Sequence, residues 1–263
     1  MSSLLTRALH DADFEAVHAA FVEAFSDYVI KLSPTREQLA EMLTRRGYVP
    51  DASVGIFDGQ RLVAFTLNGI DGDAAYDSGT GVVPSHRRRG LARAMLEFLT
   101  PRLKERGCTR YVLEVIDANH AAAELYRSHR FVETRKLQCW SFESGGGEEL
   151  AEGQIREEWC DVAPSWQNTT ASIGRARDPH IVLGNDDGYA VLFPSNGDVP
   201  QLAVRPDARR AGLGTRLLRA ASRKAGKPLR IINIDAGEEG IARFLTAAGA
   251  IKTVMQLEMI RTL

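Results

Sequence analysis

Residues 82–92 combine residue types that bind phosphate. An apolar run containing Val82 and Val83 ends at Pro84, three arginines follow, and Gly90 leads into a helical pattern. Such a strand-to-helix turn directs several backbone N–H groups toward one point at the N-terminus of a helix, where the helix dipole favours negative charge. Glycine allows close approach of the backbone, and arginine can form paired hydrogen bonds to phosphate. We therefore predict a phosphate site formed by Val82, Val83, Pro84, Arg87, Arg88, Arg89, Gly90, Leu91, Ala92 and Arg93.

The same pattern recurs 122 residues later, where Val82, Arg87 and Gly90 correspond to Val204, Arg209 and Gly212. Both copies then enter a helical pattern. An internal repeat of this kind indicates two copies of one fold. The second copy predicts a corresponding phosphate-binding set, made of Val204, Arg209, Arg210, Gly212 and Gly214.

The elements that position the first loop follow from hydrophobic spacing. Apolar residues at helical spacing predict helices over 13–25 and 35–46, and the Asp58-Gly59 turn predicts a hairpin of strands 54–57 and 62–67. A strand over 79–83 leads into the loop. A helix over 91–106, a buried strand over 111–116, a short helix over 121–128 and strands within 131–142 follow. This order predicts an α/β fold with a mixed sheet.

The second copy repeats only the core of that pattern. We expect strands over 181–183, 189–193, 201–204 and 229–234 and a helix over 213–225. The segment before residue 181 has weak periodicity, so its N-terminal helices are expected to be reduced. Residues 144–149 are polar and rich in glycine, as linkers are. We predict a first domain over 1–143, a linker over 144–152 and a second, degenerate domain over 153–263.

The loop resembles the signature [QR]-x-x-G-x-[GA] that follows a V-x-P strand end in the GNAT acetyltransferase superfamily. Arg87, Gly90 and Ala92 match it, and so do the corresponding residues of the second copy. The resemblance extends to Asn119 and to the Leu-Tyr pair that ends at Tyr126, whereas the usual Gly-Phe is here Arg130-Phe131. It implies two tandem GNAT-like domains and acetyl-CoA as the donor substrate.

The resemblance also implies roles for single residues. The backbone N–H of Val83 would polarise the thioester carbonyl, and the hydroxyl of Tyr126 would protonate or hydrogen-bond the thiolate of coenzyme A. Asn119 would orient either the pantetheine arm or the base of the helix. An amine with a pKa near 10 must also lose a proton, and Glu114 and Asp77 are both candidates for the general base. The sequence does not choose between them.

Only the first copy is expected to perform chemistry. When the two copies are aligned past the loop, Leu245 replaces Tyr126 and Asn233 replaces Glu114, while Glu238 takes the place of Asn119. Leucine cannot protonate a thiolate. The second copy would therefore hold coenzyme A or simply complete the fold.

Composition limits the other possibilities. A net charge of −1 argues against a nucleic-acid surface, and the absence of a long apolar run argues against a membrane span. Three cysteines without a C-x-x-C pair argue against a disulfide framework or a zinc site, and they favour a cytoplasmic protein. The six histidines lack metal-binding spacing, so we expect surface roles for them. A monomer or a homodimer is expected.

The acceptor is expected to be a small-molecule or peptide amine. In GNAT enzymes the loop between the first two helices and the hairpin strands bind it, which directs attention to Asp27, Tyr28, Asp71 and Asp73. Two alternatives stay open at this stage. One is a non-catalytic sensor that binds coenzyme A, and the other is an interaction protein that retains only the fold.

Overall fold

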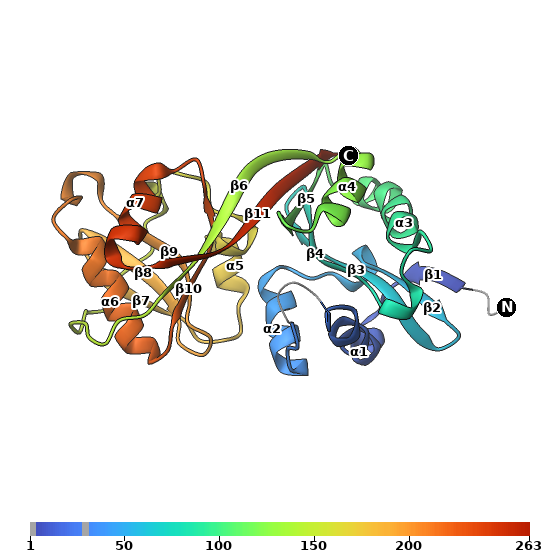
Figure 1. Ribbon diagram of the computed structural model, residues 1–263, viewed down its shortest axis with the longest axis horizontal. Coiled ribbons are helices and arrows are strands. Elements are labelled where there is room, and N and C mark those ends of the chain that lie inside the picture. Colours follow the sequence, from blue (N-terminus) through green and yellow to red (C-terminus); the bar gives the residue numbers. More distant parts are fainter. Residues whose placement is uncertain (1–3, 28–31) are drawn as a thin grey trace. The chain divides into compact units, whose positions relative to one another are not determined.

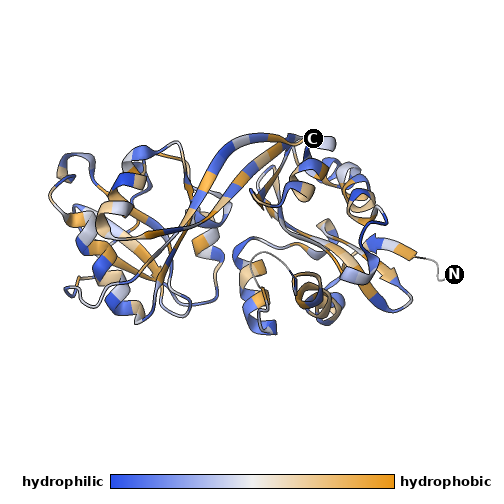
Figure 2. Cartoon of the chain, in the orientation of Figure 1, coloured by the Kyte–Doolittle hydropathy of each residue, from blue (hydrophilic) through white to orange (hydrophobic). Residues whose placement is uncertain are grey.

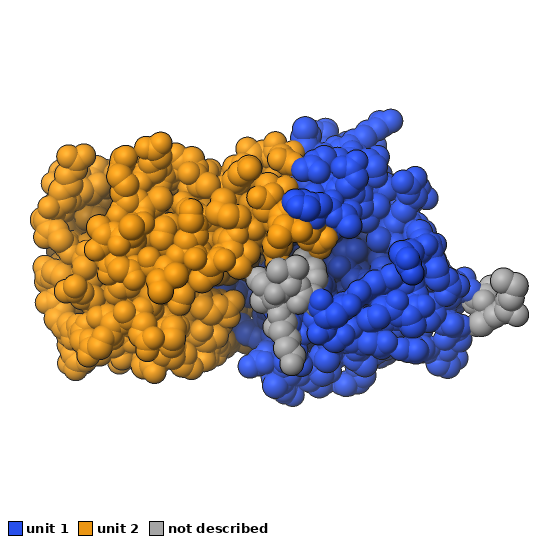
Figure 3. Space-filling view, viewed as in Figure 1, with its two compact units in different colours: residues 1–114, 120–132, 259–263 blue, residues 115–119, 133–258 orange. Residues whose placement is uncertain are grey.

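The computed structural model describes residues 4–27 and 32–263. The chain forms two compact units, which Figure 3 distinguishes by colour. Unit 1 comprises residues 1–114, 120–132 and 259–263, and unit 2 comprises residues 115–119 and 133–258. Each unit contains one of the two predicted phosphate loops.

Unit 1 contains a mixed sheet with helices on both faces (Figure 1). Strands β1 to β4 are antiparallel to their neighbours, and β5 is parallel to β4. The elements are β1 Leu4–Ala8, α1 Phe14–Ala24, α2 Arg36–Arg45, β2 Val54–Asp58, β3 Arg61–Asp71, β4 Ala74–Val82, α3 Leu91–Glu105, β5 Arg110–Ile116 and α4 His120–Ser128. Thr35 caps α2, because its hydroxyl accepts a hydrogen bond from the backbone N–H of Gln38. The predicted helices and strands of the first copy are found, although β4 begins earlier, within a buried run that starts at Ala74.

The two faces of this sheet are covered by different helices. Phe65 of β3 stacks on Phe21 of α1, with ring centroids 5.9 Å apart. Its neighbour Thr66 contacts Met95 of α3 instead. Because successive side chains of a strand point to opposite faces, α1 and α3 lie on opposite faces of the sheet.

Unit 2 contains the second copy and repeats this plan with fewer helices. Strand β10 pairs with β6 on one side and with β9 on the other, and β8 and β7 follow. The elements are β6 Val132–Phe142, α5 Thr170–Arg175, β7 Ile181–Asn185, β8 Gly188–Phe193, β9 Asp198–Val204, α6 Leu213–Ala225, β10 Leu229–Asp235, α7 Glu239–Ala248 and β11 Ile251–Thr262. Figure 2 shows hydrophobic and hydrophilic residues interspersed along α6, whose Leu218 and Ala221 join a buried apolar cluster with Leu245 of α7. Before β7 the described α-helix is the short α5, in agreement with the expected reduction.

The units are not divided at the predicted boundary between 143 and 153. Strand β6, predicted as the close of the first domain, belongs to unit 2 from Glu133 onward and pairs there with β10. The last residues of the chain, Met259–Leu263, belong to unit 1, where the N–H of Leu263 donates to the carbonyl of Thr109. Each unit therefore contains a strand segment that simple succession along the chain would assign to the other.

The predicted linker is packed against α6 within unit 2. The side chain of Arg223 donates to the carbonyl of Gly147 at 3.1 Å, and Glu148 forms an ion pair with Arg216. A Cβ atom at Gly147 would lie 2.5 Å from the carbonyl oxygen of Arg219. Glycine is required here for close approach of two backbones rather than for flexibility.

Candidate active site

Each phosphate loop ends in a left-handed glycine. Gly90 precedes α3 with a φ of 76°, and Gly212 precedes α6 with a φ of 83°. Arg88 and Arg210 also have positive φ values, of 61° and 65°. Two left-handed residues per loop turn the chain sharply into the helix, which is the geometry that makes backbone N–H groups converge on an anion.

In unit 1 the loop surrounds a pocket. Its lining residues are Val82, His86, Arg87, Arg88, Gly90, Leu91, Ala92, Arg93 and Leu125. The predicted residues Pro84 and Arg89 are exposed and lie outside this lining. His86 is buried and its ring contacts Asp58 and Ser85, so the expected surface role is wrong for this histidine.

The signature arginines hold the loop in place. The guanidinium of Arg87 donates to both carboxylate oxygens of Asp27 at 2.7 Å and to the carbonyls of Val82 and Ala24. Arg209 makes the corresponding contacts, with Asp161 and with the carbonyls of Val204 and Trp159. The predicted direct contact of Arg87 and Arg209 with a phosphate is replaced by hydrogen bonds to the chain itself, which leaves exposed Arg88 and Arg93 as the cations at the pocket of unit 1.

The backbone N–H of Val83 points toward β3. It donates to the carbonyl of Val63 on β3 at 3.0 Å, so the expectation that it polarises a thioester is wrong. Because N–H groups alternate in direction along an antiparallel strand, those of Thr80 and Val82 point away from β3. On that side β4 pairs with β5 only from Ala74 to Asp77, although β4 itself continues to Val82. The stretch beyond Asp77, where β4 and β5 no longer pair, is called the strand gap.

A β-bulge at Ser78 changes which side chains share a face of β4. Asp77 opposes Asn68 on β3, but the next opposed pair is Gly79 with Leu67, so Ser78 is an extra residue. The bulge places Asp77 and Thr80 on the same face, where the hydroxyl of Thr80 donates to Asp77 Oδ2 at 2.7 Å. This is the face covered by α3, because Thr80 also contacts Thr66.

Tyr126 meets Asp77 on that face. The Tyr126 hydroxyl of α4 donates to Asp77 Oδ2 at 3.1 Å, and the N–H of Gly79 donates to Oδ1 at 2.9 Å. Both side chains are buried. Burial raises the pKa of Asp77 to about 6, against the opposing effect of its hydrogen bonds with Thr80, Tyr126 and Gly79.

Glu114 lies on the opposite face. Within β5, Tyr111 packs on Phe131 beside Tyr126, so Glu114, three residues further along, faces away from α4. Its Oε2 accepts a hydrogen bond of 2.8 Å from the hydroxyl of Tyr76. The two candidate bases, Glu114 and Asp77, are thus on different faces of the sheet, beside the point where β4 and β5 cease to pair.

Residues predicted to lie around this centre are placed as follows. Asn119 immediately precedes α4, and its N–H donates to the carbonyl of Ile116. Asp27 is bound to Arg87, and Asp73 accepts a hydrogen bond from Thr109 and pairs with Arg110, so their charges are already compensated. Tyr28 lies outside the described residues.

Sequence reasoning missed Arg46, at the end of α2. Its guanidinium donates to the carbonyl of the bulge residue Ser78 at 2.9 Å. A Cβ atom at Gly69 would lie 2.0 Å from the carbonyl oxygen of Arg46, so the backbone at the end of α2 is in direct contact with β3. No motif in the sequence marks either contact.

In unit 2 the equivalent gap contains part of the chain itself. The carbonyl of Asn168 accepts a hydrogen bond from Gln201 of β9, and its side-chain amide donates to the carbonyl of Ile232 of β10. Gln201 stands at the position of Gly79, and Ile232 at that of Leu113. Asn168 is 2% exposed. It therefore bridges two strands at the place where β4 and β5 separate in unit 1.

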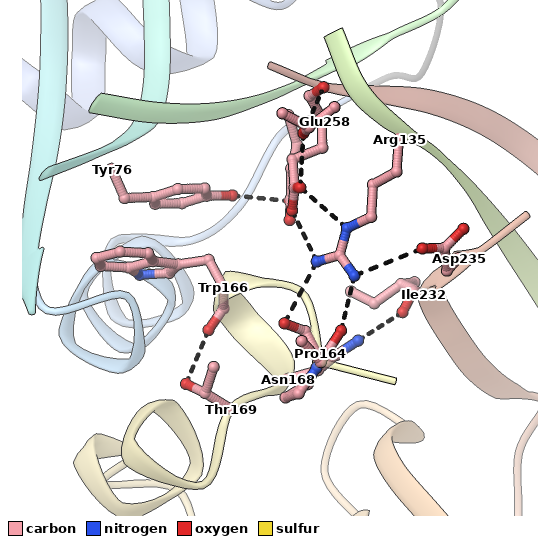
Figure 4. A network of polar contacts seen from close by, with 12 residues as sticks. Tyr76, Arg135, Pro164, Trp166, Asn168, Thr169, Ile232, Asp235 and Glu258 are labelled. Carbon is pink, nitrogen blue, oxygen red and sulfur yellow. Dashed lines mark hydrogen bonds and ion pairs between the residues drawn. The ribbon is translucent and has the colours of Figure 1, made fainter. Parts of the chain in front are cut away.

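An ion-pair network holds this segment of unit 2 in place (Figure 4). Arg135 of β6 donates to both carboxylate oxygens of Glu258 at 2.8 and 2.9 Å and lies 3.7 Å from Asp235. The same guanidinium donates to the carbonyls of Ala163 and Pro164. Arg135 thus fixes the chain just before Asn168, and the buried Leu245 stands where unit 1 has Tyr126.

Residues 4–27 and 32–263, which the structure describes, contain neither a metal-binding cluster nor a membrane-spanning helix. Within them no group of three His, Cys, Asp or Glu side chains is arranged to hold a metal ion. No helix in the same ranges has the length and apolar character needed to span a bilayer.

Comparisons with known proteins agree with this geometry. Residues 14–131 match the acetyltransferase (GNAT) family. The chain is 38% identical over 76 residues to a mycothiol acetyltransferase of Mycolicibacterium smegmatis, covering 27% of this chain and 26% of that protein. It is also 38% identical over 73 residues to the ribosomal protein bS18-alanine N-acetyltransferase of Escherichia coli, covering 28% of this chain and 49% of that protein. The chain thus spans about a quarter to a half of these relatives.

The whole chain also has a counterpart among solved structures. A tandem GNAT protein from the clavulanic acid biosynthesis pathway superposes with a TM-score of 0.69 at 15% identity, covering 99% of this chain and 98% of that one. At this identity the likeness concerns the fold, which is a tandem arrangement of two GNAT-like units. The loop, the strand separation and the family match agree, and residues 14–131 form a domain of the GNAT acetyltransferase family.

Proposed function

We propose that the chain is an N-acetyltransferase that transfers the acetyl group of acetyl-CoA to a primary amine, and that the reaction takes place in unit 1. The observation that carries this proposal is the placement of Glu114 and Tyr126 on opposite faces of the sheet, where β4 and β5 separate beside the loop pocket. Direct transfer needs a base on the acceptor side and an acid on the thiol side, and this arrangement supplies one of each.

The residues present suit a coenzyme A donor. The N–H groups at the start of α3 and the exposed Arg88 and Arg93 favour a diphosphate at the loop. The N–H groups of Thr80 and Val82 are directed toward the gap, where they can bind the pantetheine arm and the thioester oxygen. Nothing lies within 4 Å of a Cβ atom built on Gly90, so the loop leaves room for a ligand there.

The reaction then proceeds by direct attack. An amine that is protonated in solution first loses one proton to solvent. The neutral amine then gives a proton to Glu114 as its nitrogen forms a bond to the acetyl carbon, and the carbonyl oxygen gains negative charge facing the N–H groups of β4. When this intermediate collapses, the C–S bond breaks and its electron pair stays on sulfur, which takes a proton from Tyr126. Glu114 loses its proton to solvent and Tyr126 regains one.

Unit 2 is proposed to be inactive in this reaction. Leu245 replaces the acid, and Asn168 occupies the position between β9 and β10 that an acceptor would need. In addition, a Cβ atom at Gly214 would lie 3.2 Å from the ring of Phe244, so this ring lies beside the first turn of α6. Unit 2 then serves the fold, or binds coenzyme A without reacting.

Release of coenzyme A tests the proposal. Purified protein is incubated with acetyl-CoA and a panel of amines, amino acids, aminoglycosides and peptides, including a peptide with N-terminal alanine, which the name of the E. coli relative suggests. Free thiol is titrated, and the acetylated amine is identified by mass spectrometry. Tyr126→Phe should lower turnover about 10²-fold and Glu114→Gln by about 10²-fold or more. Binding of acetyl-CoA without turnover of any amine would instead support a coenzyme A sensor.

A further inference from the structure

Asp77 is a buried carboxyl group that the reaction above does not use. It accepts hydrogen bonds from the hydroxyls of Tyr126 and Thr80 and from the N–H of Gly79. It faces α4, away from Glu114, so it lies on the wrong side of the sheet to deprotonate an amine held near Glu114. Something other than base catalysis must account for a carboxyl group at this position.

We propose that Asp77 is a positioning residue for the acid: it holds the Tyr126 hydroxyl at the strand gap, and the hydroxyl moves from Asp77 to the sulfur when the C–S bond breaks. This inference rests on the proposed function and adds a residue to it. Apart from Tyr126, Asp77 is held by two donors, the N–H of Gly79 and the hydroxyl of Thr80, and the bulge at Ser78 is what brings Thr80 onto the same face. The carboxylate therefore has a fixed position, from which it orients the hydroxyl of Tyr126.

The surroundings of Asp77 are consistent with this role. Arg46 contributes the positive charge that acts on Asp77, and Tyr126 and Thr80 act on it through hydrogen bonds. Tyr126 has few alternative orientations, because its ring packs edge-on against Phe131 with centroids 5.5 Å apart. A packed ring with one anchored hydroxyl needs little reorganisation during the reaction.

A double-mutant cycle on turnover provides the test. Asp77→Asn, Tyr126→Phe and the double variant are compared with the wild type, using acetyl-CoA and the amine that the panel identifies, at pH 7.5. We expect Asp77→Asn to lower kcat about 10-fold to 10²-fold with little change in KM for acetyl-CoA. In the Tyr126→Phe background it should change kcat less than about 2-fold, because it acts only through Tyr126. Losses that multiply in the double variant would overturn the inference.

A second donor separates positioning of the acid from a general structural role. p-Nitrothiophenyl acetate releases a stable thiolate that needs no protonation. With this donor Asp77→Asn and Tyr126→Phe should both approach wild-type kcat, whereas Glu114→Gln should remain slow. An equal deficit of Asp77→Asn with both donors would contradict the assignment.

The hydrogen bond can also be observed without changing Asp77. In protein with ¹³C-labelled aspartate carboxyl groups, the Asp77 resonance should titrate near pH 6, and Tyr126→Phe should raise its midpoint, because the hydroxyl of Tyr126 lowers the pKa of Asp77. An unchanged midpoint would overturn the inference. If the wild type acetylates no amine of the panel, the proposed function is contradicted, and the inference that rests on it is contradicted as well.

Discussion

The buried carboxyl group of Asp77 makes the stability of unit 1 depend on pH, and Asp77→Asn should remove that dependence. Burial raises the pKa of Asp77 from 3.8 to about 6 in the folded protein. A group whose pKa is raised on folding contributes stability that is fully present below its unfolded pKa and is lost as pH rises through its folded pKa. About two pKa units at about 1.4 kcal/mol each give a total loss of roughly 3 kcal/mol, of which about 2 kcal/mol falls between pH 4 and pH 6.

Urea unfolding at pH 4, 5, 6 and 7 measures this effect. The three tryptophans all lie in unit 2, so fluorescence follows unit 2 while far-UV circular dichroism follows both units. The advantage of Asp77→Asn over wild type should grow by about 2.4 kcal/mol from pH 4 to pH 7, whatever pH-independent cost the amide introduces.

A matched control is Asp73, in the turn between β3 and β4. Asp73 is exposed and its pKa is lowered, chiefly by the hydrogen bond from Thr109. Asp73→Asn should therefore show no gain over wild type as pH rises. If the difference between Asp77→Asn and wild type stays constant within about 0.5 kcal/mol over the same range, the reasoning about burial of Asp77 is refuted.

Two further predictions concern the backbone. Arg130 has a φ of 67° at the turn after α4, where the second copy has Gly249 with a φ of 92°. Arg130→Gly should therefore stabilise unit 1 by about 0.5–1 kcal/mol in urea unfolding. A loss of stability would show that the Arg130 side chain matters more than the backbone strain. Gly69→Ala should lower the free energy of unfolding by about 1–3 kcal/mol, because its Cβ would collide with the carbonyl of Arg46. Gly79→Ala, whose Cβ would have its nearest contact at 3.6 Å, should lower it by less than half as much. Equal losses would contradict the close approach at Gly69.

Much of the site could be predicted from the sequence because it depends on local rules. A strand end, a glycine and a helical pattern define each phosphate loop, and the helical periodicity placed Tyr126 on a short helix that follows a buried strand. These features depend on neighbours a few residues apart, so a single sequence contains them.

What the sequence could not provide depends on register and on distant partners. Whether Val82 or Val83 directs its N–H into the gap is decided by the pairing of β4 with β3, and an error of one residue reverses the direction. The bulge at Ser78 changes the face of Asp77 relative to Thr80 for the same reason. The partner of Arg87 is 60 residues away, at Asp27, and no pattern connects them.

The sequence also could not predict that β6 belongs to unit 2 from Glu133 onward and that Met259–Leu263 belong to unit 1. Nor could it predict that Asn168 lies between β9 and β10. Both copies have a last strand of similar character, so hydrophobic pattern alone does not say which unit each strand joins. Asn168 lies in a polar segment that reads as a loop, and its role depends on carbonyl and amide groups of β9 and β10.

The claim that unit 1 alone performs the transfer is tested most directly by comparing Gly90→Glu with Gly212→Glu in one turnover assay. The two glycines are closely matched, since both precede a helix with positive φ and neither has an atom within 4 Å of a built Cβ. Strain is therefore similar in the two variants, and circular dichroism is measured to check that each is folded. We predict that Gly90→Glu loses acetyl transfer while Gly212→Glu retains it. Loss of activity in Gly212→Glu with activity preserved in Gly90→Glu would place the chemistry in unit 2 and contradict the account.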